Sequence, residues 1–193
     1  MVRGFRKSVS CLIPLKKLVY LISPNKIYKN FYNDLQAVLS YGNVKFFQLR
    51  LKKIKQKNLI KIANKIKKIT LKNKVKLLIN DDYKIAIKSK ADGCHMGQLD
   101  GSIKIAKKKL KNKIIGITCH NSKILAKKAI KDKANYIAFG SFFKSGLKPN
   151  AKKANQTILK WSKKNIKKPI VVIGGINNLN YKRLIKFGAK YIA

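Results

Sequence analysis

The chain has 193 residues, of which 46% are hydrophobic, and it carries 47 Lys and Arg against six acidic residues, a formal net charge of +41. This length and apolar content fit one globular domain with a full core. Charged residues interrupt every apolar run before about 20 residues, so no segment is expected to cross a bilayer. The three cysteines have neither metal nor redox spacing, which favours a reducing cytoplasm over a disulfide framework.

The basic charge alone suggests a phosphate-rich partner such as nucleic acid or an anionic membrane. The lysines, however, are spread along the whole chain, without an arginine-rich or aromatic-interleaved motif. Such a distribution indicates a residue bias on solvated faces, so we expect small-molecule partners and no specific nucleic acid. A non-catalytic nucleic-acid binder remains an alternative, and homo-oligomer formation stays open. Residues 1–17, basic and free of acids, are expected to be an N-terminal extension or a targeting segment.

In chain order, the sequence shows a regular alternation of two patterns. Helical periods place Leu59, Ile62, Ile66 and Ile69 on one face, and later Leu179, Leu184 and Phe187 on another, before Gly188. Between such segments lie eight short β-rich runs, at residues 18–22, 44–50, 75–80, 92–96, 113–118, 135–140, 169–175 and 190–193.

Near-continuous apolar strands separated by amphipathic helices are typical of a parallel sheet covered on its outer side. Eight such units in about 200 residues favour an α/β (β/α)8 TIM barrel over an open doubly wound sheet. We therefore predict one barrel domain over residues 18–193. Its eighth strand ends at Ala193 with no eighth helix, so the barrel is expected to lack its last helix.

Four of the six acids fall within one twenty-residue window otherwise rich in lysine: Asp81, Asp82, Asp92 and Asp100. Asp81 ends the third strand and Asp100 follows the fourth, and adjacent strand ends of a barrel converge. The two carboxylates could therefore share a hard cation such as Mg²⁺, which prefers oxygen ligands. Asp82 is interpreted as a helix cap and Asp92 as a turn residue. His95 could be an acid or base, or a structural histidine of the barrel lining.

The second strand ends with three polar residues on one side, Gln48, Arg50 and Lys52, a poor pattern for a barrel interior unless that side meets a ligand. Arg50 is informative because the chain has only four arginines, at 3, 6, 50 and 183. A guanidinium offers the planar fork that binds phosphate in a bidentate manner, which Lys cannot reproduce. The paired glycines Gly174 and Gly175 at the seventh strand end allow close approach of an anion, although a tight turn is the ordinary explanation.

Taken in order, six strand ends resemble the thiamine phosphate synthase/TenI superfamily over residues 18–193. The motifs are Q-L-R-x-K, I-N-D, D-G-x-H-x-G-Q-x-D, G-I-T-x-H, A-F-G-S-F-F-x-S-x-x-K and I-G-G-I-N. The resemblance implies a (β/α)8 barrel that joins 4-amino-5-hydroxymethyl-2-methylpyrimidine diphosphate to a thiazole phosphate, releasing pyrophosphate. It implies Asp81 and Asp100 as Mg²⁺ ligands, with Arg50, Lys52 and Lys148 stabilising the leaving group. The implied substrate-binding residues are Gln48, Arg50, Lys52, Asn80, Thr118, Ser145, Lys148 and Gly175.

Two departures from the family pattern are visible. The loop after the sixth strand has Leu147 where the family usually has a hydroxyl residue, and the chain lacks the further strand end whose small residues bind the thiazole phosphate. A rival within the superfamily is a TenI-type thiazole tautomerase, which uses a histidine at the position of His120. The Q-x-R and H-x-G-Q-x-D elements favour the synthase.

Overall fold

The computed structural model describes residues 18–144 and 153–193, in which eight parallel strands form a closed barrel, each paired with the next and β8 with β1. The expectations for residues 1–17 lie outside this part of the chain. The strands are β1 (Val19–Ile22), β2 (Val44–Leu49), β3 (Lys76–Asn80), β4 (Gly93–Met96), β5 (Ile114–Thr118), β6 (Tyr136–Gly140), β7 (Ile170–Ile173) and β8 (Tyr191–Ile192).

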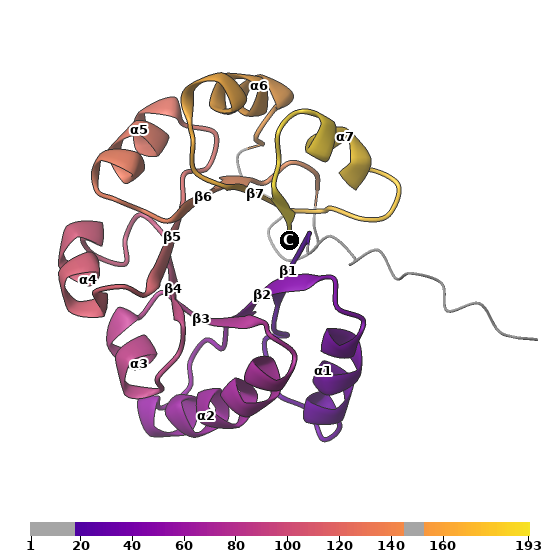
Figure 1. Cartoon of the computed structure of the whole chain (residues 1–193), viewed down its shortest axis with the longest axis vertical. Helices are drawn as coiled ribbons and strands as arrows, with labels where there is room; N and C mark the ends of the chain where they lie inside the picture. Colours follow the sequence, from indigo (N-terminus) through magenta and orange to yellow (C-terminus); the bar gives the residue numbers. More distant parts are fainter. Residues whose placement is uncertain (1–17, 145–152) are drawn as a thin grey trace, which may run out of the picture.

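Within the described residues, seven helices alternate with the strands and lie outside the ring that the strands form (Figure 1). They are α1 (Phe31–Ser40), α2 (Gln56–Lys72), α3 (Tyr83–Lys88), α4 (Ile103–Leu110), α5 (Lys123–Lys131), α6 (Gln156–Asn165) and α7 (Tyr181–Lys186). The predicted (β/α)8 architecture is thus confirmed, and the described residues include seven helices. None of the described helices combines the length and apolar character that spanning a bilayer would require.

Two hydrophobic layers result from the period-two alternation of the strands. Residues such as Phe47, Leu49, Leu77 and Ile79 face outward and pack against the helices. Their neighbours face the barrel axis, where the interior is filled by Tyr20, Phe46, Leu78, Tyr136, Ala138, Val171 and Tyr191. The interior is therefore a packed core, and only its C-terminal end can present polar side chains to a ligand.

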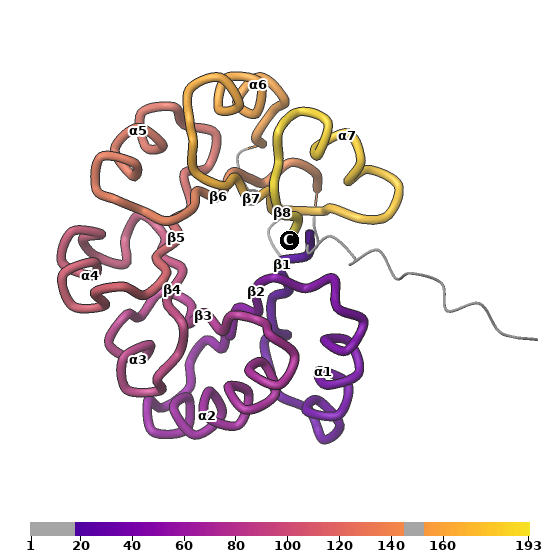
Figure 2. The backbone as a smooth tube through the Cα atoms, in the orientation of Figure 1, coloured from indigo at the N-terminus to yellow at the C-terminus, as the bar shows by residue number. Residues whose placement is uncertain are grey.

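The ring closes where β8 meets β1, with Val19 aligned to Ile192 (Figure 2). The N–H of Ile192 donates to the Leu18 carbonyl at 2.9 Å. One detail of the helix prediction is wrong. Leu184 is buried on α7 as expected, but Leu179 precedes the helix and is 88% exposed, because the N-terminal turn at Asn177–Asn180 delays the helix start.

Candidate active site

Because all eight strands are parallel, their C-terminal ends open on the same mouth of the barrel. At that mouth the Gln48 amide on β2 donates from Nε2 to Oδ1 of Asn80 on β3, at 3.0 Å. Gln48 is buried, since it lies on the same side of its strand as the interior residue Phe46. The predicted residues Gln48 and Asn80 are thus brought together, and the hydrogen bond fixes the orientation of both amides.

Arg50 follows β2 and is held against the end of β1. Its backbone N–H donates to Oγ of Ser23 at 2.9 Å, and its Nη1 donates to Oδ1 of Asn25 at 3.3 Å. Among the described residues the Asn25 contact uses only part of the guanidinium fork, which leaves other N–H donors for a ligand. Lys52, two residues on, is exposed. Both cations act electrostatically on the carboxylate of Asp81, so they lie on the side of the mouth that faces it.

Asp81 and Asp100 form a carboxylate pair across the ends of β3 and β4. The pKa of Asp81 is raised to about 6, and the largest cause is its partial burial. A hydrogen bond with the Asp100 carboxyl group and the negative charge of that group raise it further. The charges of Lys52 and Arg50 oppose this rise without cancelling it. Oδ2 of Asp100 accepts the Gly97 N–H at 2.6 Å, which fixes that side chain in its loop. The structure therefore holds two carboxylates close together despite their mutual repulsion.

A divalent cation fits this donor set. Two oxygen ligands at a strongly basic surface are the hard donors that Mg²⁺ prefers, and a cation between them would relieve the repulsion that raises the pKa of Asp81. No cluster of three or more His, Cys, Asp or Glu side chains that could hold a metal occurs in residues 18–144 and 153–193. Such an ion would therefore complete its coordination with substrate phosphate oxygens and water, as Mg²⁺ commonly does.

Thr118, at the end of β5, is half-buried at the mouth, and its backbone carbonyl accepts a hydrogen bond from Nε2 of Gln98 at 2.6 Å. Its hydroxyl lies 2.8 Å from Nε2 of His95, and Nδ1 of His95 lies 2.7 Å from the Tyr136 hydroxyl. Burial lowers the pKa of His95 to about 4, although Asp100 raises it slightly. Of the two open interpretations for His95, the structural histidine of the barrel lining agrees with this burial.

The far side of the mouth is built by the glycines that end β7. Gly174 has φ +101° and Gly175 has φ +63°, conformations that favour glycine. A Cβ on Gly174 would lie 1.9 Å from Oγ of Ser141, and one on Gly175 would lie 2.4 Å from the Lys144 carbonyl oxygen. This close approach places Gly175 beside the loop that leads to Ser145 and Lys148, two predicted site residues that lie outside the described part of the chain.

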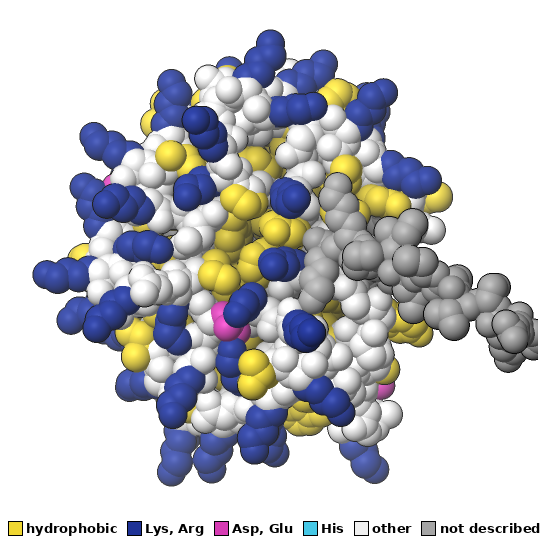
Figure 3. All heavy atoms as spheres, in the orientation of Figure 1, with side chains coloured by type: hydrophobic (Ala, Val, Ile, Leu, Met, Phe, Trp, Pro, Cys, Tyr) yellow, Lys and Arg dark blue, Asp and Glu magenta, His cyan; other side chains and the backbone are white. Residues whose placement is uncertain are grey.

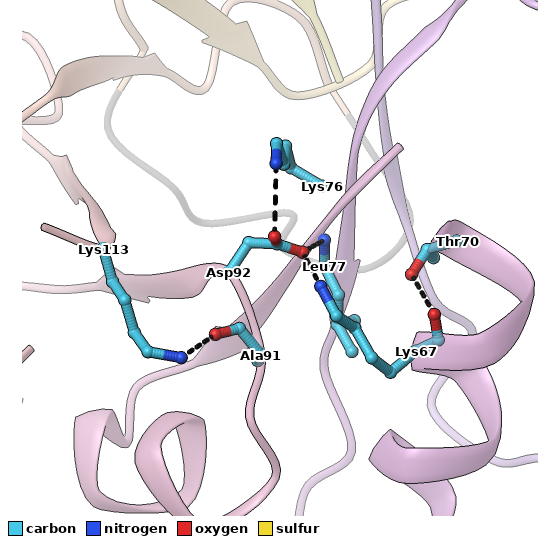
Figure 4. A network of polar contacts seen from close by, with 7 residues as sticks. All are labelled: Lys67, Thr70, Lys76, Leu77, Ala91, Asp92 and Lys113. Atoms are coloured by element: carbon cyan, nitrogen blue, oxygen red, sulfur yellow. Dashed lines mark hydrogen bonds and ion pairs between the residues drawn. The ribbon is translucent and has the colours of Figure 1, made fainter. Parts of the chain in front are cut away.

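Asp82 and Asp92 have local structural roles. Asp82 caps α3 as predicted, since its Oδ1 accepts the N–H groups of Lys84 and Ile85 at 2.7 and 3.1 Å. Asp92 precedes β4 at the opposite end of the barrel from the mouth, where its carboxylate joins α2, β3 and β4 (Figure 4). The carboxylate accepts hydrogen bonds from Nζ of Lys67 at 2.5 Å and from Nζ of Lys76 at 3.4 Å. It also accepts one from the backbone N–H of Leu77 at 2.8 Å. It therefore bridges elements and does more than complete a turn.

The sequence did not indicate individual roles for three residues at or behind the mouth: Gln98, Tyr20 and Tyr136. A signal for the tyrosines did exist, because alternation along β1 and β6 places both inside the barrel, where a buried hydroxyl must find a partner. Gln98 lies in the H-x-G-Q-x-D motif, but its contact with Thr118 depends on the fold of the loop. His120, the histidine of the rival interpretation, is exposed just after β5.

The lysine excess does not gather at one place on the face drawn in Figure 3, where Lys and Arg side chains lie all around the periphery. On this face no continuous basic stripe follows one helix or groove among the residues described.

Comparison with known proteins agrees with the geometry of the mouth. The family model described as thiamine monophosphate synthase matches residues 19–193. A thiamine-phosphate synthase of Pelagibacter ubique (strain HTCC1062) is 56% identical over 179 residues, which cover 92% of this chain and 86% of that protein. Another from Erythrobacter litoralis (strain HTCC2594) is 38% identical over 180 residues, covering 91% and 84%.

A solved structure of a related protein supports the same family assignment. The thiamine phosphate pyrophosphorylase from Pyrococcus furiosus superposes with a TM-score of 0.82 at 26% sequence identity, covering 92% of this chain and 84% of that one. The barrel, the order of its strand-end motifs and the extent of these matches agree. The chain therefore belongs to the thiamine monophosphate synthase family.

Proposed function

We propose that this chain is a thiamine phosphate synthase, a transferase that joins 4-amino-5-hydroxymethyl-2-methylpyrimidine diphosphate to a thiazole phosphate and releases pyrophosphate. Family membership supports the reaction. The observation that carries the proposal is the arrangement at the mouth, where the cations Arg50 and Lys52 act on the Asp81–Asp100 carboxylate pair beside an oriented pair of amides. Such a site suits a diphosphate with its metal ion.

The pyrimidine diphosphate is assigned to the side of the mouth formed by β2 to β5. Gln48, Asn80 and Thr118 would hold the pyrimidine, since their side chains offer fixed donors and acceptors at buried or half-buried positions. The diphosphate would lie against Arg50 and Lys52, with Lys148 from the loop after β6. When bound at Asp81 and Asp100, Mg²⁺ would supply charge neutralisation to the phosphate oxygens.

The reaction breaks a carbon–oxygen bond and forms a carbon–nitrogen bond. Pyrophosphate leaves with the electron pair of the bond to the methylene carbon, and the pyrimidine ring stabilises the cation that remains. Arg50, Lys52 and Lys148 stabilise the negative charge that builds on the leaving group. The thiazole nitrogen then donates its lone pair to the methylene carbon, which both sub-sites hold in line, so no protein nucleophile is required.

The thiazole phosphate is assigned to the opposite side of the mouth. Gly175 would allow its phosphate to approach the backbone, because the glycine carries no Cβ in an already crowded loop. The Ser145 hydroxyl would donate a hydrogen bond to the same phosphate. A reducing cytoplasm is the proposed compartment, and the buried thiols of Cys94 and Cys119 are free.

The test is a measurement of pyrophosphate release from the pyrimidine diphosphate, with and without thiazole phosphate and Mg²⁺. Release that requires both is expected of the wild-type protein and should fall strongly in Asp81→Ala and Arg50→Ala. Matched controls are Asp34→Ala on α1 and Arg183→Ala on α7, two exposed residues on the outer helices, which should behave as wild type.

Three results would contradict the proposal. Turnover that is unaffected by Asp81→Ala and Arg50→Ala would reject the assignment of sites. Isomerisation of a thiazole phosphate without pyrophosphate release, lost in His120→Ala, would favour the tautomerase. Salt-sensitive binding of DNA with no turnover would leave only a nonspecific electrostatic interaction.

A further inference from the structure

Four side chains form a continuous line of hydrogen bonds from the closed interior of the barrel to its mouth. The hydroxyls of Tyr20 and Tyr136 lie 2.8 Å apart, Tyr136 Oη lies 2.7 Å from Nδ1 of His95, and Nε2 of His95 lies 2.8 Å from Oγ1 of Thr118. Tyr20 and Tyr136 are 2% and 1% exposed, and only Thr118 reaches the site. The line thus has one blind end and one open end.

Packing holds these side chains in place. The His95 and Tyr136 rings stack, with centroids 5.6 Å apart and planes inclined by 19°, and Tyr20 meets Tyr136 edge-on at 5.8 Å. Gly116 on β5 makes room for the Tyr136 ring, because a Cβ at that glycine would lie 1.8 Å from Cζ of Tyr136. The ring positions are therefore fixed by the core, and only the protons of the line can be arranged in more than one way.

Counting protons decides between the arrangements. A neutral imidazole donates from one nitrogen and accepts at the other, and each hydroxyl has one proton to donate. If Nδ1 of His95 carried a proton, it would donate to Tyr136, whose own proton would go to Tyr20. The Tyr20 proton would then have no acceptor, since its hydroxyl bonds only to Tyr136 within the described residues and is buried. A cationic imidazole meets the same difficulty.

The opposite direction satisfies every proton in the line. Tyr20 donates to Tyr136, Tyr136 donates to Nδ1 of His95, and Nε2–H donates to Oγ1 of Thr118. The Thr118 proton then has no acceptor inside the line and is free to point into the site. Leaving a buried donor without an acceptor costs more than a single hydrogen bond gains, so this direction prevails.

We propose that Tyr20, Tyr136 and His95 are positioning residues that lock the Thr118 hydroxyl as a hydrogen-bond donor to an acceptor atom of the bound pyrimidine diphosphate. The assignment of that substrate rests on the proposed function, whereas the direction of the line does not. As a donor, the Thr118 hydroxyl favours the edge of the pyrimidine ring that presents a hydrogen-bond acceptor. Its free proton matches a ring nitrogen or an oxygen, whereas an amino group could meet only the remaining lone pair of Oγ1 and would leave that proton without a partner.

The direction of the line is measurable without substrate. The chain has only two histidines, so ¹⁵N-histidine labelling gives two imidazoles in a long-range ¹H–¹⁵N spectrum, and His120→Gln assigns them. His95 is expected as the Nε2–H tautomer in the wild-type protein and in Tyr20→Phe, where the direction is retained. Tyr136→Phe removes the partner of Nδ1, so each tautomer then leaves one buried nitrogen unpaired, the preference for Nε2–H weakens and the Nδ1–H population should rise from its wild-type level. A wild-type His95 in the Nδ1–H form, or one unchanged by Tyr136→Phe, would overturn the proposal.

Stability and positioning can be separated by a second variant. Tyr136→Phe alone leaves the Tyr20 hydroxyl without a partner, which lowers stability, whereas Tyr20→Phe/Tyr136→Phe removes both hydroxyls and should recover most of that loss. In the double variant, the Nδ1–H population of His95 should be raised as it is in Tyr136→Phe. Tyr191→Phe is the matched control, because that tyrosine lies in the same interior and has no hydrogen bond to another described residue. It should leave the His95 tautomer unchanged.

Turnover tests the consequence for Thr118. We expect kcat/KM for the pyrimidine diphosphate to fall about tenfold in Thr118→Val and by a smaller factor in Tyr136→Phe. In the Thr118→Val background, Tyr136→Phe should cause no further loss, since it acts through a hydroxyl already removed. Additive losses would show that Tyr136 acts structurally and would overturn the proposal. A wild-type protein without any turnover would instead reject the proposed function, and the NMR result would stand apart from it.

Discussion

Two acidic sites on the same pair of strands, β3 and β4, differ in almost everything except residue type. At the mouth, Asp81 faces a second carboxylate, and its pKa is raised to about 6 by burial and by Asp100. At the other end, burial alone would raise the pKa of Asp92, but hydrogen bonds from Lys67 and the Leu77 N–H outweigh it and lower that pKa below its usual range. A carboxylate whose charge is satisfied within the chain stabilises the fold, and one that is not satisfied is available to a ligand.

The largest effect is expected from a substitution of the carboxylate at the mouth, Asp81. Asp81→Asn should reduce pyrophosphate release about 100-fold or more, because it removes a proposed metal ligand and the charge that opposes Arg50 and Lys52. Its stability should equal or exceed that of the wild type, since the repulsion with Asp100 disappears. Steady-state assays with Mg²⁺ and urea denaturation measure the two quantities. A variant that is both active and less stable would place Asp81 among the structural residues.

The opposite substitution, Asp92→Ala, should mainly lower stability, by about 2 kcal/mol, because Lys67 and the Leu77 N–H lose their partner in a partly buried setting. Activity per folded molecule should stay near the wild-type value, since Asp92 lies at the far end of the barrel. Chemical denaturation followed by circular dichroism gives the free energy of unfolding. Unchanged stability together with lost turnover would contradict this division of roles.

The sequence could predict that Asp81 and Asp100 lie close together, but it could not predict the partners of Asp92. Asp81 and Asp100 follow consecutive strands, and in a parallel barrel strand ends meet, so their approach follows from topology. The partner of Asp92 is a lysine on α2, 25 residues away, and among so many lysines no local pattern distinguishes Lys67. The Tyr20–Tyr136 contact spans 116 residues and depends on the barrel having closed. Leu179 was misplaced because hydrophobic period does not reveal where a turn delays a helix.

The cations beside the pair allow a finer test. Arg50→Lys keeps the positive charge near Asp81, so the pKa of that carboxyl should change little, but it loses the planar fork that Asn25 helps to hold. We expect kcat/KM for the pyrimidine diphosphate to fall about tenfold, with a smaller change for the thiazole phosphate. Initial-rate kinetics with each substrate varied in turn would measure both. Equal losses for the two substrates would indicate a general disturbance of the mouth.

The smallest effect concerns the pH dependence of stability, which should have opposite signs at the two sites. The folded pKa of Asp81, about 6, lies above its ordinary value of 3.8, so its contribution to stability is present below about pH 4 and is lost as the pH rises to 6. The lowered pKa of Asp92 contributes stability above its ordinary pKa, which is lost on acidification. In the absence of metal, Asp81→Asn should therefore gain about 2 °C over the wild type between pH 4.5 and pH 7, a small shift because water screens the partly exposed carboxyl. Mg²⁺ should remove this gain at pH 7 by stabilising the wild type alone, because the proposed site binds the ion at the ionised pair and the amide variant lacks one of its two ligands. Thermal melting at the two pH values, with EDTA or Mg²⁺, measures the effect, and an equal response of both proteins to Mg²⁺ would show that the ion binds elsewhere.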